Sequence, residues 1–136
     1  MKPARDIPPV GNCDVAICVS RAVLTDLATK WAPLIMRQLA RGDKRYSELR
    51  VAIEGISEKM LAQTLRELER DGLVVRTSHD VVPPHLVYSL STLGKECAPL
   101  VARLLRWIEM HVRDLKGAQR VYDANARVRA AKEPAA

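Results

Sequence analysis

A helix pattern that passes directly into two strand patterns is the feature that most constrains this chain's fold. Leu61, Leu65 and Leu68 recur at helical spacing and form one narrow apolar stripe. The segments 73–77 and 86–90 follow, and both have the composition of β-strands. This part of the sequence therefore predicts a short helix followed by a β-hairpin.

Apolar residues at helical spacing predict further helices on both sides of this unit. Aromatic residues make up only 4% of the chain and Phe is absent, so the core must be aliphatic, which favours helices. The expected helices cover about residues 19–27, 32–39, 46–53 and 58–70 before the strands and 92–115 after them. The first of them could be capped by Ser20 or begin one turn earlier. This order predicts a mainly α protein with a small β-hairpin wing, an α+β winged helix-turn-helix.

The 136 residues suit one compact domain with extensions. We expect an N-terminal arm over 1–17, a winged helix-turn-helix domain with a C-terminal dimerisation helix over 18–115, and an Ala/Arg-rich tail over 116–136. The tail composition is compatible with a loose helix and with a disordered segment. Pro83 and Pro84 lie in the expected hairpin loop.

The outer face of the 58–70 helix is rich in hydrogen-bond donors. At about 100° per residue, four long polar side chains lie opposite the leucine stripe: Lys59, Gln63, Arg66 and Arg70. Such side chains donate to guanine, adenine and phosphate groups in a major groove. An ordinary solvated helix face would look the same in isolation. The short helix before it and the wing after it favour DNA binding.

Further candidate DNA contacts surround this helix. Ser57 is the expected N-cap, and Lys44 and Arg45 are expected at the start of the preceding helix, where a backbone phosphate would lie. The wing adds Arg76 in its first strand, with His79 and His85 flanking its tip. Each of these residues is equally compatible with a role in solubility alone. The net charge of +6 agrees with a polyanionic partner without proving one.

Several classes of protein lack support in the sequence. It contains no phosphate loop, HExxH motif, nucleophile elbow or dinucleotide fingerprint, so we expect neither an enzyme nor a cofactor. The histidines are dispersed, and the spacing of Cys13 and Cys18 is not that of a zinc finger, so no metal site is expected. No signal peptide or membrane span is visible, and we expect a cytoplasmic protein without a membrane partner.

Three cysteines, Cys13, Cys18 and Cys97, are too few for a disulfide scaffold and are expected to be reduced thiols. Cys18 lies at the start of the first helix, where unpaired N–H groups, the helix dipole and Arg21 would stabilise a thiolate. Cys13 could then resolve a sulfenic acid on Cys18, either within one subunit or between two. The alternative is that Cys18 is a small buried apolar residue.

The last expected helix carries more apolar surface than one stripe. Its candidate dimerisation residues are Leu100, Leu104, Trp107 and Ile108. Such a helix at the end of a small domain usually packs against a partner subunit. The alternative is burial within its own monomer.

Residues from Cys18 to about His111 resemble the HxlR family of bacterial winged-helix regulators, which share their fold with the MarR group. The resemblance rests on Lys30-Trp31, Tyr46-Ser47-Glu48-Leu49, Gly55-Ile56-Ser57, Leu61, Leu65-Arg66-Glu67-Leu68-Glu69, Asp71-Gly72-Leu73-Val74, Val82-Pro83-Pro84, Tyr88-Ser89-Leu90 and Leu93-Gly94.

This resemblance implies a homodimer that binds an operator in double-stranded DNA as a repressor or activator. It also implies that Cys18 matches an N-terminal cysteine that senses oxidants, quinones or aldehydes in several members. The chain departs from the family at Val19, where Pro is usual, at Ala28-Thr29, where Gly-Gly is usual, and at His85, where a basic residue is usual.

The sequence thus predicts a sequence-specific transcriptional regulator that binds an inverted-repeat operator as a homodimer. Its possible effector is a small electrophile or another molecule, acting through Cys18. A winged-helix module that binds protein instead of specific DNA is the alternative, but the cationic face of the 58–70 helix speaks against it. A thiol-based enzyme has less support, because no histidine lies near any cysteine in the sequence.

Overall fold

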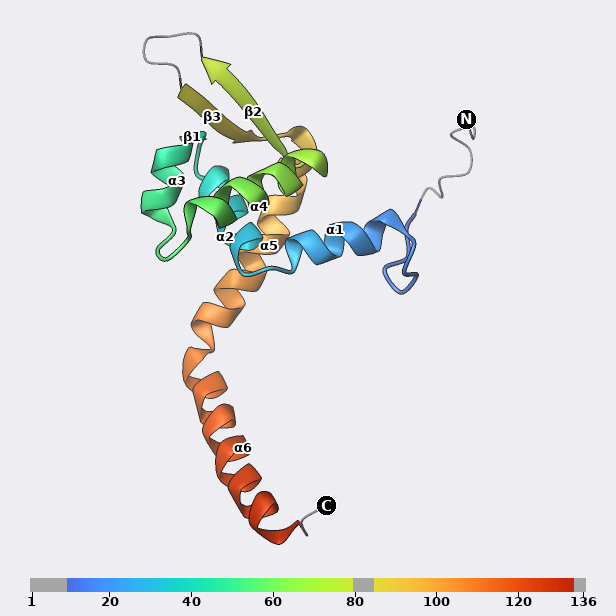
Figure 1. Cartoon of the computed structure of the whole chain (residues 1–136), viewed down its shortest axis with the longest axis vertical. Coiled ribbons are helices and arrows are strands. Elements are labelled where there is room, and N and C mark those ends of the chain that lie inside the picture. Colours follow the sequence, from blue (N-terminus) through green and yellow to red (C-terminus); the bar gives the residue numbers. More distant parts are fainter. Residues whose placement is uncertain (1–9, 80–84, 134–136) are drawn as a thin grey trace. The chain divides into compact units, whose positions relative to one another are not determined.

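The computed structural model describes residues 10–79 and 85–133 of the chain. One small sheet lies at the edge of a group of helices, and its hairpin projects away from them (Figure 1). The elements are α1 (Val19–Leu27), α2 (Trp31–Ala40), β1 (Lys44–Arg45), α3 (Tyr46–Ala52), α4 (Glu58–Arg70), β2 (Val74–His79), β3 (His85–Leu90), α5 (Thr92–Met110) and α6 (Val112–Lys132). The predicted winged helix-turn-helix is confirmed. The expected loop prolines, Pro83 and Pro84, and most of the expected arm lie outside the described residues.

Both ends of α4 are fixed by local hydrogen bonds. At its start, the Oγ atom of Ser57 accepts a hydrogen bond from the backbone N–H of Met60 at 3.1 Å, which confirms the expected N-cap. At its end, the N–H of Leu73 bonds to the carbonyl of Leu68, and Gly72 has a φ of +77°. Glycine adopts this left-handed conformation without strain, so the chain can leave the helix and enter β2.

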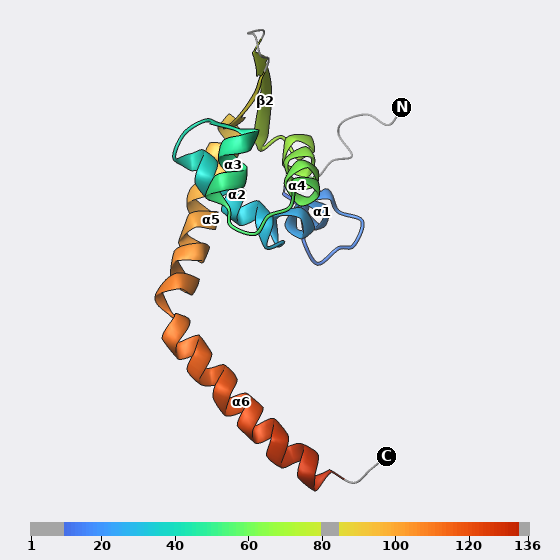
Figure 2. The same ribbon diagram turned by 60° about the vertical axis from the view of Figure 1, so that its left-hand side comes forward.

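The wing belongs to a three-stranded antiparallel sheet in the order β1-β3-β2. The first strand corrects the sequence prediction, because Lys44 and Arg45 were expected at the start of a helix. They pair instead with Tyr88 and Val87 of β3. Figure 2 shows β2 edge-on, extending away from α3 and α4.

The core is aliphatic, as the composition predicted. It is built from one face of α2, the leucine stripe of α4, and residues of α3, the sheet and α5. Its buried apolar members are Ala32, Ile35, Met36, Leu39, Leu49, Ile53, Ile56, Leu61, Leu65, Leu68, Leu73, Val74, Tyr88, Leu90 and Ala98. This core holds α4 with its leucine stripe inward and its opposite face in solvent.

A close backbone contact joins the start of α5 to the start of β2. The Oγ atom of Ser91 donates to the carbonyl of Gly72 at 2.5 Å and accepts from the N–H of Gly94 at 2.9 Å. Gly94 is buried, and a Cβ atom there would collide with the carbonyl oxygen of Leu73. Position 94 therefore requires glycine, because the backbone of α5 passes so close to the Leu73 carbonyl.

The chain divides into two compact units, residues 1–102 and residues 103–136. In the second unit, the prediction of one helix over 92–115 was wrong at its end, because α5 stops at Met110 and α6 begins at Val112. The ring Nδ1 of His111 lies 2.7 Å from the carbonyl oxygen of Trp107. The backbone N–H of His111 donates instead to the carbonyl of Ile108. The ring thus occupies the acceptor that a continuing α-helix would use.

The segment expected as a loose helix or a disordered tail is helical up to Lys132, where α6 ends. No residue of this helix is buried. Among the residues that the structure describes, no helix is long and apolar enough to cross a membrane.

Candidate nucleic-acid interface

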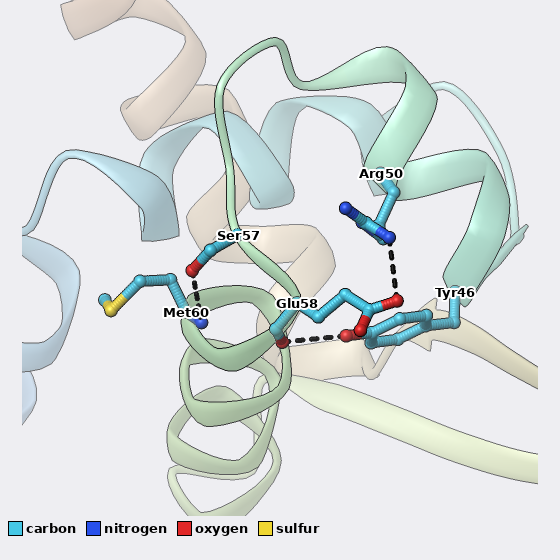
Figure 3. A network of polar contacts seen from close by, with 5 residues as sticks. All are labelled: Tyr46, Arg50, Ser57, Glu58 and Met60. Atoms are coloured by element: carbon cyan, nitrogen blue, oxygen red, sulfur yellow. Dashed lines mark hydrogen bonds and ion pairs between the residues drawn. The ribbon is translucent and has the colours of Figure 1, made fainter.

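The turn between α3 and α4 is fixed by two contacts to Glu58 at the start of α4 (Figure 3). The hydroxyl of Tyr46 donates to the Glu58 backbone carbonyl at 2.8 Å. The guanidinium of Arg50 pairs with the Glu58 carboxylate at 2.7 Å. Because this ion pair is exposed, its contribution to stability is small, but both contacts fix the orientation of α4 relative to α3.

The outer face of α4 is accessible over its length. Lys59, Gln63, Arg66 and Arg70 are all exposed, opposite the buried leucines. The amide of Gln63 donates to the carboxylate of Glu67 at 3.1 Å, so this side chain is already oriented along the helix. The face therefore presents three cations and one amide.

Lys44 and Arg45 lie directly before α3, on the edge strand β1. The backbone N–H of Arg45 donates to the carboxylate of Glu48 at 2.9 Å, and the Arg45 side chain is exposed. Lys44 is half-buried. These cations keep their expected place at the start of α3, on a strand instead of a helix.

The predicted wing residues occupy two different environments. The Arg76 guanidinium lies 3.8 Å from the carboxylate of Glu69 on α4, so its charge is partly offset in the free protein. His79 and His85 pair in register at the loop end of the hairpin, and their rings stack with centroids 5.1 Å apart. The wing thus supplies a paired arginine near α4 and two stacked imidazoles near its tip.

Cys18 is the N-cap residue of α1, as its position predicted. Its Sγ atom accepts hydrogen bonds from the Ser20 hydroxyl at 2.9 Å and from the Asn12 backbone N–H at 3.5 Å. These hydrogen bonds, with that of Ser20 the strongest, lower the pKa of the Cys18 thiol. Ser20 and Asn12 therefore supply the stabilisation that the sequence interpretation assigned partly to Arg21.

Cys13 reaches the same serine. Its thiol donates to the backbone carbonyl of Ser20 at 3.8 Å, so both cysteines contact Ser20. A Cβ atom on Gly11 would lie 2.8 Å from the Ser20 side chain and 3.4 Å from Cys18 Sγ, which shows how closely this segment folds. Cys97 is half-buried, and burial raises the pKa of its thiol. The pKa of the thiol is thus lowered at Cys18 and raised at Cys97.

The four candidate dimerisation residues are exposed in the single chain. The exposed fractions are 66% for Leu100, 57% for Leu104, 53% for Trp107 and 41% for Ile108. The alternative of complete burial within the monomer does not describe these side chains. The Trp107 ring also stacks on the His111 ring, with centroids 4.6 Å apart.

Sequence reasoning missed the residues that support the site. Neither Tyr46 nor Glu58 was predicted as a site residue, yet the two fix the turn. Ser20 carries no motif that links it to Cys18. No group of metal-ligating side chains occurs among residues 10–79 and 85–133.

Comparison with known proteins places this geometry in a family. Residues 26–116 match the family model described as HxlR-like helix-turn-helix. The HTH-type transcriptional regulator YtfH of Escherichia coli is 46% identical over 102 residues, which are 75% of this chain and 81% of that protein.

Solved structures agree with this assignment. The structure of the transcriptional regulator ytfH from Salmonella typhimurium has 42% identity and a TM-score of 0.77, and the match covers 82% of this chain and 99% of that one. The redox regulator HypR in its oxidized form has 34% identity and a TM-score of 0.63, with 68% and 96% covered. The chain therefore belongs to the HxlR-like helix-turn-helix family of transcriptional regulators.

Proposed function

We propose that this regulator binds an inverted-repeat operator in double-stranded DNA as a homodimer, with α4 as its recognition helix. The observation that carries the proposal is the exposed outer face of α4, where three cations and one amide lie opposite a buried leucine stripe. A helix held this way by its core and by the turn before it can enter a major groove as a rigid element.

The surrounding residues receive distinct roles. Gln63 and Arg66, in the middle of α4, read base edges, while Lys59 and Arg70 lie nearer its ends and hold phosphates. The remaining contacts to the DNA backbone and minor groove come from Lys44, Arg45, Ser57, Arg76, His79 and His85. Arg76 must exchange its partner Glu69 for a phosphate, so its contribution is smaller than that of an unpaired arginine.

Exposed apolar side chains on α5 support the homodimer. Leu100, Leu104, Trp107 and Ile108 recur at helical spacing, and burying them against a second copy removes apolar surface from water. A two-fold dimer then presents two copies of α4, which matches an operator with inverted symmetry.

A footprint on the promoter DNA beside the protein's own gene tests this function. We expect protection of an inverted repeat at nanomolar protein, with a random duplex of equal length bound far more weakly at the same salt concentration. Equal affinity for both duplexes would contradict sequence-specific binding. A protected direct repeat or single half-site would contradict the two-fold arrangement.

We further propose that oxidation of Cys18 regulates DNA binding. The thiolate attacks a peroxide, giving a sulfenic acid at Cys18 and releasing the leaving oxygen as water after proton uptake. The Cys13 thiol then attacks the sulfenic sulfur, forming a Cys13–Cys18 disulfide and releasing water. The shared contact with Ser20 and the lowered pKa of Cys18 support this order. Similarity to the redox regulator HypR agrees with it.

Operator binding before and after mild peroxide, in the parent and three variants, tests the switch. The parent should lose affinity, Cys18→Ser should be insensitive, and Cys13→Ser should stop at a sulfenic acid that dimedone traps. Ser20→Ala should slow the reaction by raising the pKa of Cys18. If the parent binds unchanged while mass spectrometry shows Cys18 oxidised, the thiol does not regulate binding.

A further inference from the structure

Helix α6 carries a line of cations along one side. Arg113, Lys116, Arg120 and Arg127 lie at spacings of three, four and seven residues, so at 100° per residue they fall within a sector of about 60°. With a rise of 1.5 Å per residue, this line is about 21 Å long. We call these four residues the basic stripe.

All four side chains of the basic stripe are exposed. None of them forms an ion pair with another residue that the structure describes, and Asp123, which flanks the stripe, does not neutralise it. The other arginine of the helix, Arg129, lies over the ring of Tyr122 at 5.5 Å, outside the stripe. Like charges at these spacings repel one another, so the stripe costs the isolated helix some stability.

Neither core packing nor the family fold accounts for helix α6. It has no buried residue, and most of its length lies beyond residue 116, where the match to the family model ends. Its six cations and two carboxylates give it a net charge of +4. Its large apolar side chains all lie off the basic stripe but cover a sector of about 200°, which is much broader than the narrow seam by which a coiled coil would bind a second copy.

We propose that α6 is a second DNA-binding element, in which the basic stripe contacts the phosphate backbone without reading sequence. Double-stranded DNA carries about one negative charge per 1.7 Å of axis when both strands are counted, so the 21 Å of duplex beside the stripe carries about twelve phosphate charges, more than the four cations can neutralise. Contact with this polyanion removes the repulsion within the stripe and releases counterions. This inference rests on the proposed DNA-binding function and adds a sequence-independent contact outside the winged helix-turn-helix.

The salt dependence of DNA binding by the full chain tests this proposal. We compare the parent with Arg113→Gln/Lys116→Gln/Arg120→Gln/Arg127→Gln on the operator and on a random duplex, and check helix content by circular dichroism. Each lost phosphate contact reduces the steepness of the plot of log K against log salt by about 0.9, so the fourfold variant should lose up to about 3.6 per subunit, or about 7.2 for the homodimer. Its affinity for both duplexes should fall by the same factor, which leaves the ratio of the two affinities unchanged.

A matched pair of variants controls for net charge. Lys116→Gln/Arg120→Gln removes two charges from the stripe, and Arg129→Gln/Lys132→Gln removes two charges from elsewhere on α6. The first should reduce this steepness by about 1.8 per subunit, or about 3.6 for the homodimer, and the second by much less. Equal effects of the two variants would overturn the proposal, and so would an unchanged slope in the fourfold variant. A fourfold variant that sediments as a monomer would also overturn it, in favour of a second copy on α6.

These outcomes are separate from failure of the proposed function. If the parent binds operator and random duplex equally, specific recognition by α4 is refuted, whereas the slopes of the α6 variants still report on the stripe. If the parent prefers its operator and the salt dependence of the α6 variants equals that of the parent, recognition by α4 is supported and phosphate binding by the basic stripe is refuted.

Discussion

At the scale of single residues, hydrogen bonds from side chains to the backbone fix the ends of the functional helices. Ser57 holds the start of α4, Tyr46 attaches that start to α3, and Ser91 connects the start of α5 to Gly72. Each such bond contributes only about 0.5–1.5 kcal/mol to stability. Their effect on function comes from geometry, because a recognition helix must keep its orientation to read DNA.

Gly94→Ala should destabilise the winged helix-turn-helix by about 1–3 kcal/mol, the usual cost of forcing extra volume into a packed site. The added methyl group would collide with the Leu73 carbonyl, which is backbone and cannot move aside cheaply. Urea unfolding followed by circular dichroism measures the change. Gly117→Ala is the control, because nothing lies within 4 Å of its added methyl group, and this variant should not be destabilised. Equal stability of the parent and Gly94→Ala would contradict the described contact.

A carboxyl pair predicts how stability depends on pH. Burial, followed by the hydrogen bond and charge of Asp26 on α1, raises the pKa of Asp71 to about 6. Glu67 adds to this effect and Arg70 opposes it. The proton on Asp71 is therefore lost from the unfolded chain near pH 4 but from the folded protein only near pH 6. The corresponding stability is complete below pH 4 and is lost as the pH rises to about 6.

Asp71→Asn should remove this part of the pH dependence, because an amide does not titrate. Free energies of unfolding at pH 4 and pH 7 should therefore differ less in the variant than in the parent. Asp26→Asn should act in the same direction by removing the charge beside Asp71. A parent whose stability is flat across this range, after correction for the other carboxylates, would contradict the raised pKa.

At the scale of elements, sequence periodicity was sufficient for the helices that pack on the core. The α1 prediction of about 19–27 agrees with the structure, which settles its open start with Cys18 and not Ser20 as the N-cap. The boundaries of α3 and α4 agree within one residue, because buried leucines mark both helices and Ser57 caps α4. Strand β1 could not be predicted, since two residues show no period and only their pairing with β3 defines them. The end of α5 depends on the ring of His111, whose bond to Trp107 has no signature in the sequence.

The same limit applies to the candidate site. Helical spacing placed Lys59, Gln63, Arg66 and Arg70 on one face, because a helix repeats regularly. The ion pair between Arg76 and Glu69 joins two elements, and its geometry depends on how β2 leaves α4. The contacts of Cys18 likewise depend on how the segment before α1 folds back. The face of a helix on which a side chain lies was predictable from the sequence, whereas side-chain contacts between two elements were not.

Variants of α4 and β1 should separate base reading from phosphate binding. Gln63→Ala and Arg66→Ala should each cost about 1–3 kcal/mol on the operator and reduce the preference over random DNA. Lys44→Ala and Arg45→Ala should weaken binding to both duplexes and lower the salt slope. Fluorescence anisotropy with the two duplexes at several salt concentrations measures both effects. If the α4 variants lose specific and random DNA equally, α4 does not read bases.

At the scale of the whole molecule, the proposed function requires two copies of the chain. One α4 reads one half-site, and a single half-site offers few contacts against the many competing sites of a genome. The exposed apolar residues of α5 offer the surface for pairing. The chain should therefore sediment at micromolar concentration with twice its mass of 15.2 kDa.

Leu104→Arg should shift this equilibrium towards monomer, because the dimer would have to bury an unpaired charge. Val51→Arg introduces the same charge on α3, at a side chain that is 87% exposed, and should remain dimeric. A parent that sediments as a monomer would contradict both the dimer and the inverted-repeat operator.

Operator spacing provides an independent measure of the same dimer. A two-fold dimer should place its two α4 helices in successive major grooves about 34–36 Å apart, so the half-site centres should lie about one helical turn, or a small multiple of turns, apart. Inserting about half a turn of DNA, roughly five base pairs, between the half-sites rotates one of them to the opposite side of the duplex. Affinity measured by gel shift should then fall to the level of a single half-site. The Leu104→Arg variant is the control, because a monomer should bind the original and the expanded operator equally. If the parent also binds both equally, its two recognition helices do not act as a fixed pair.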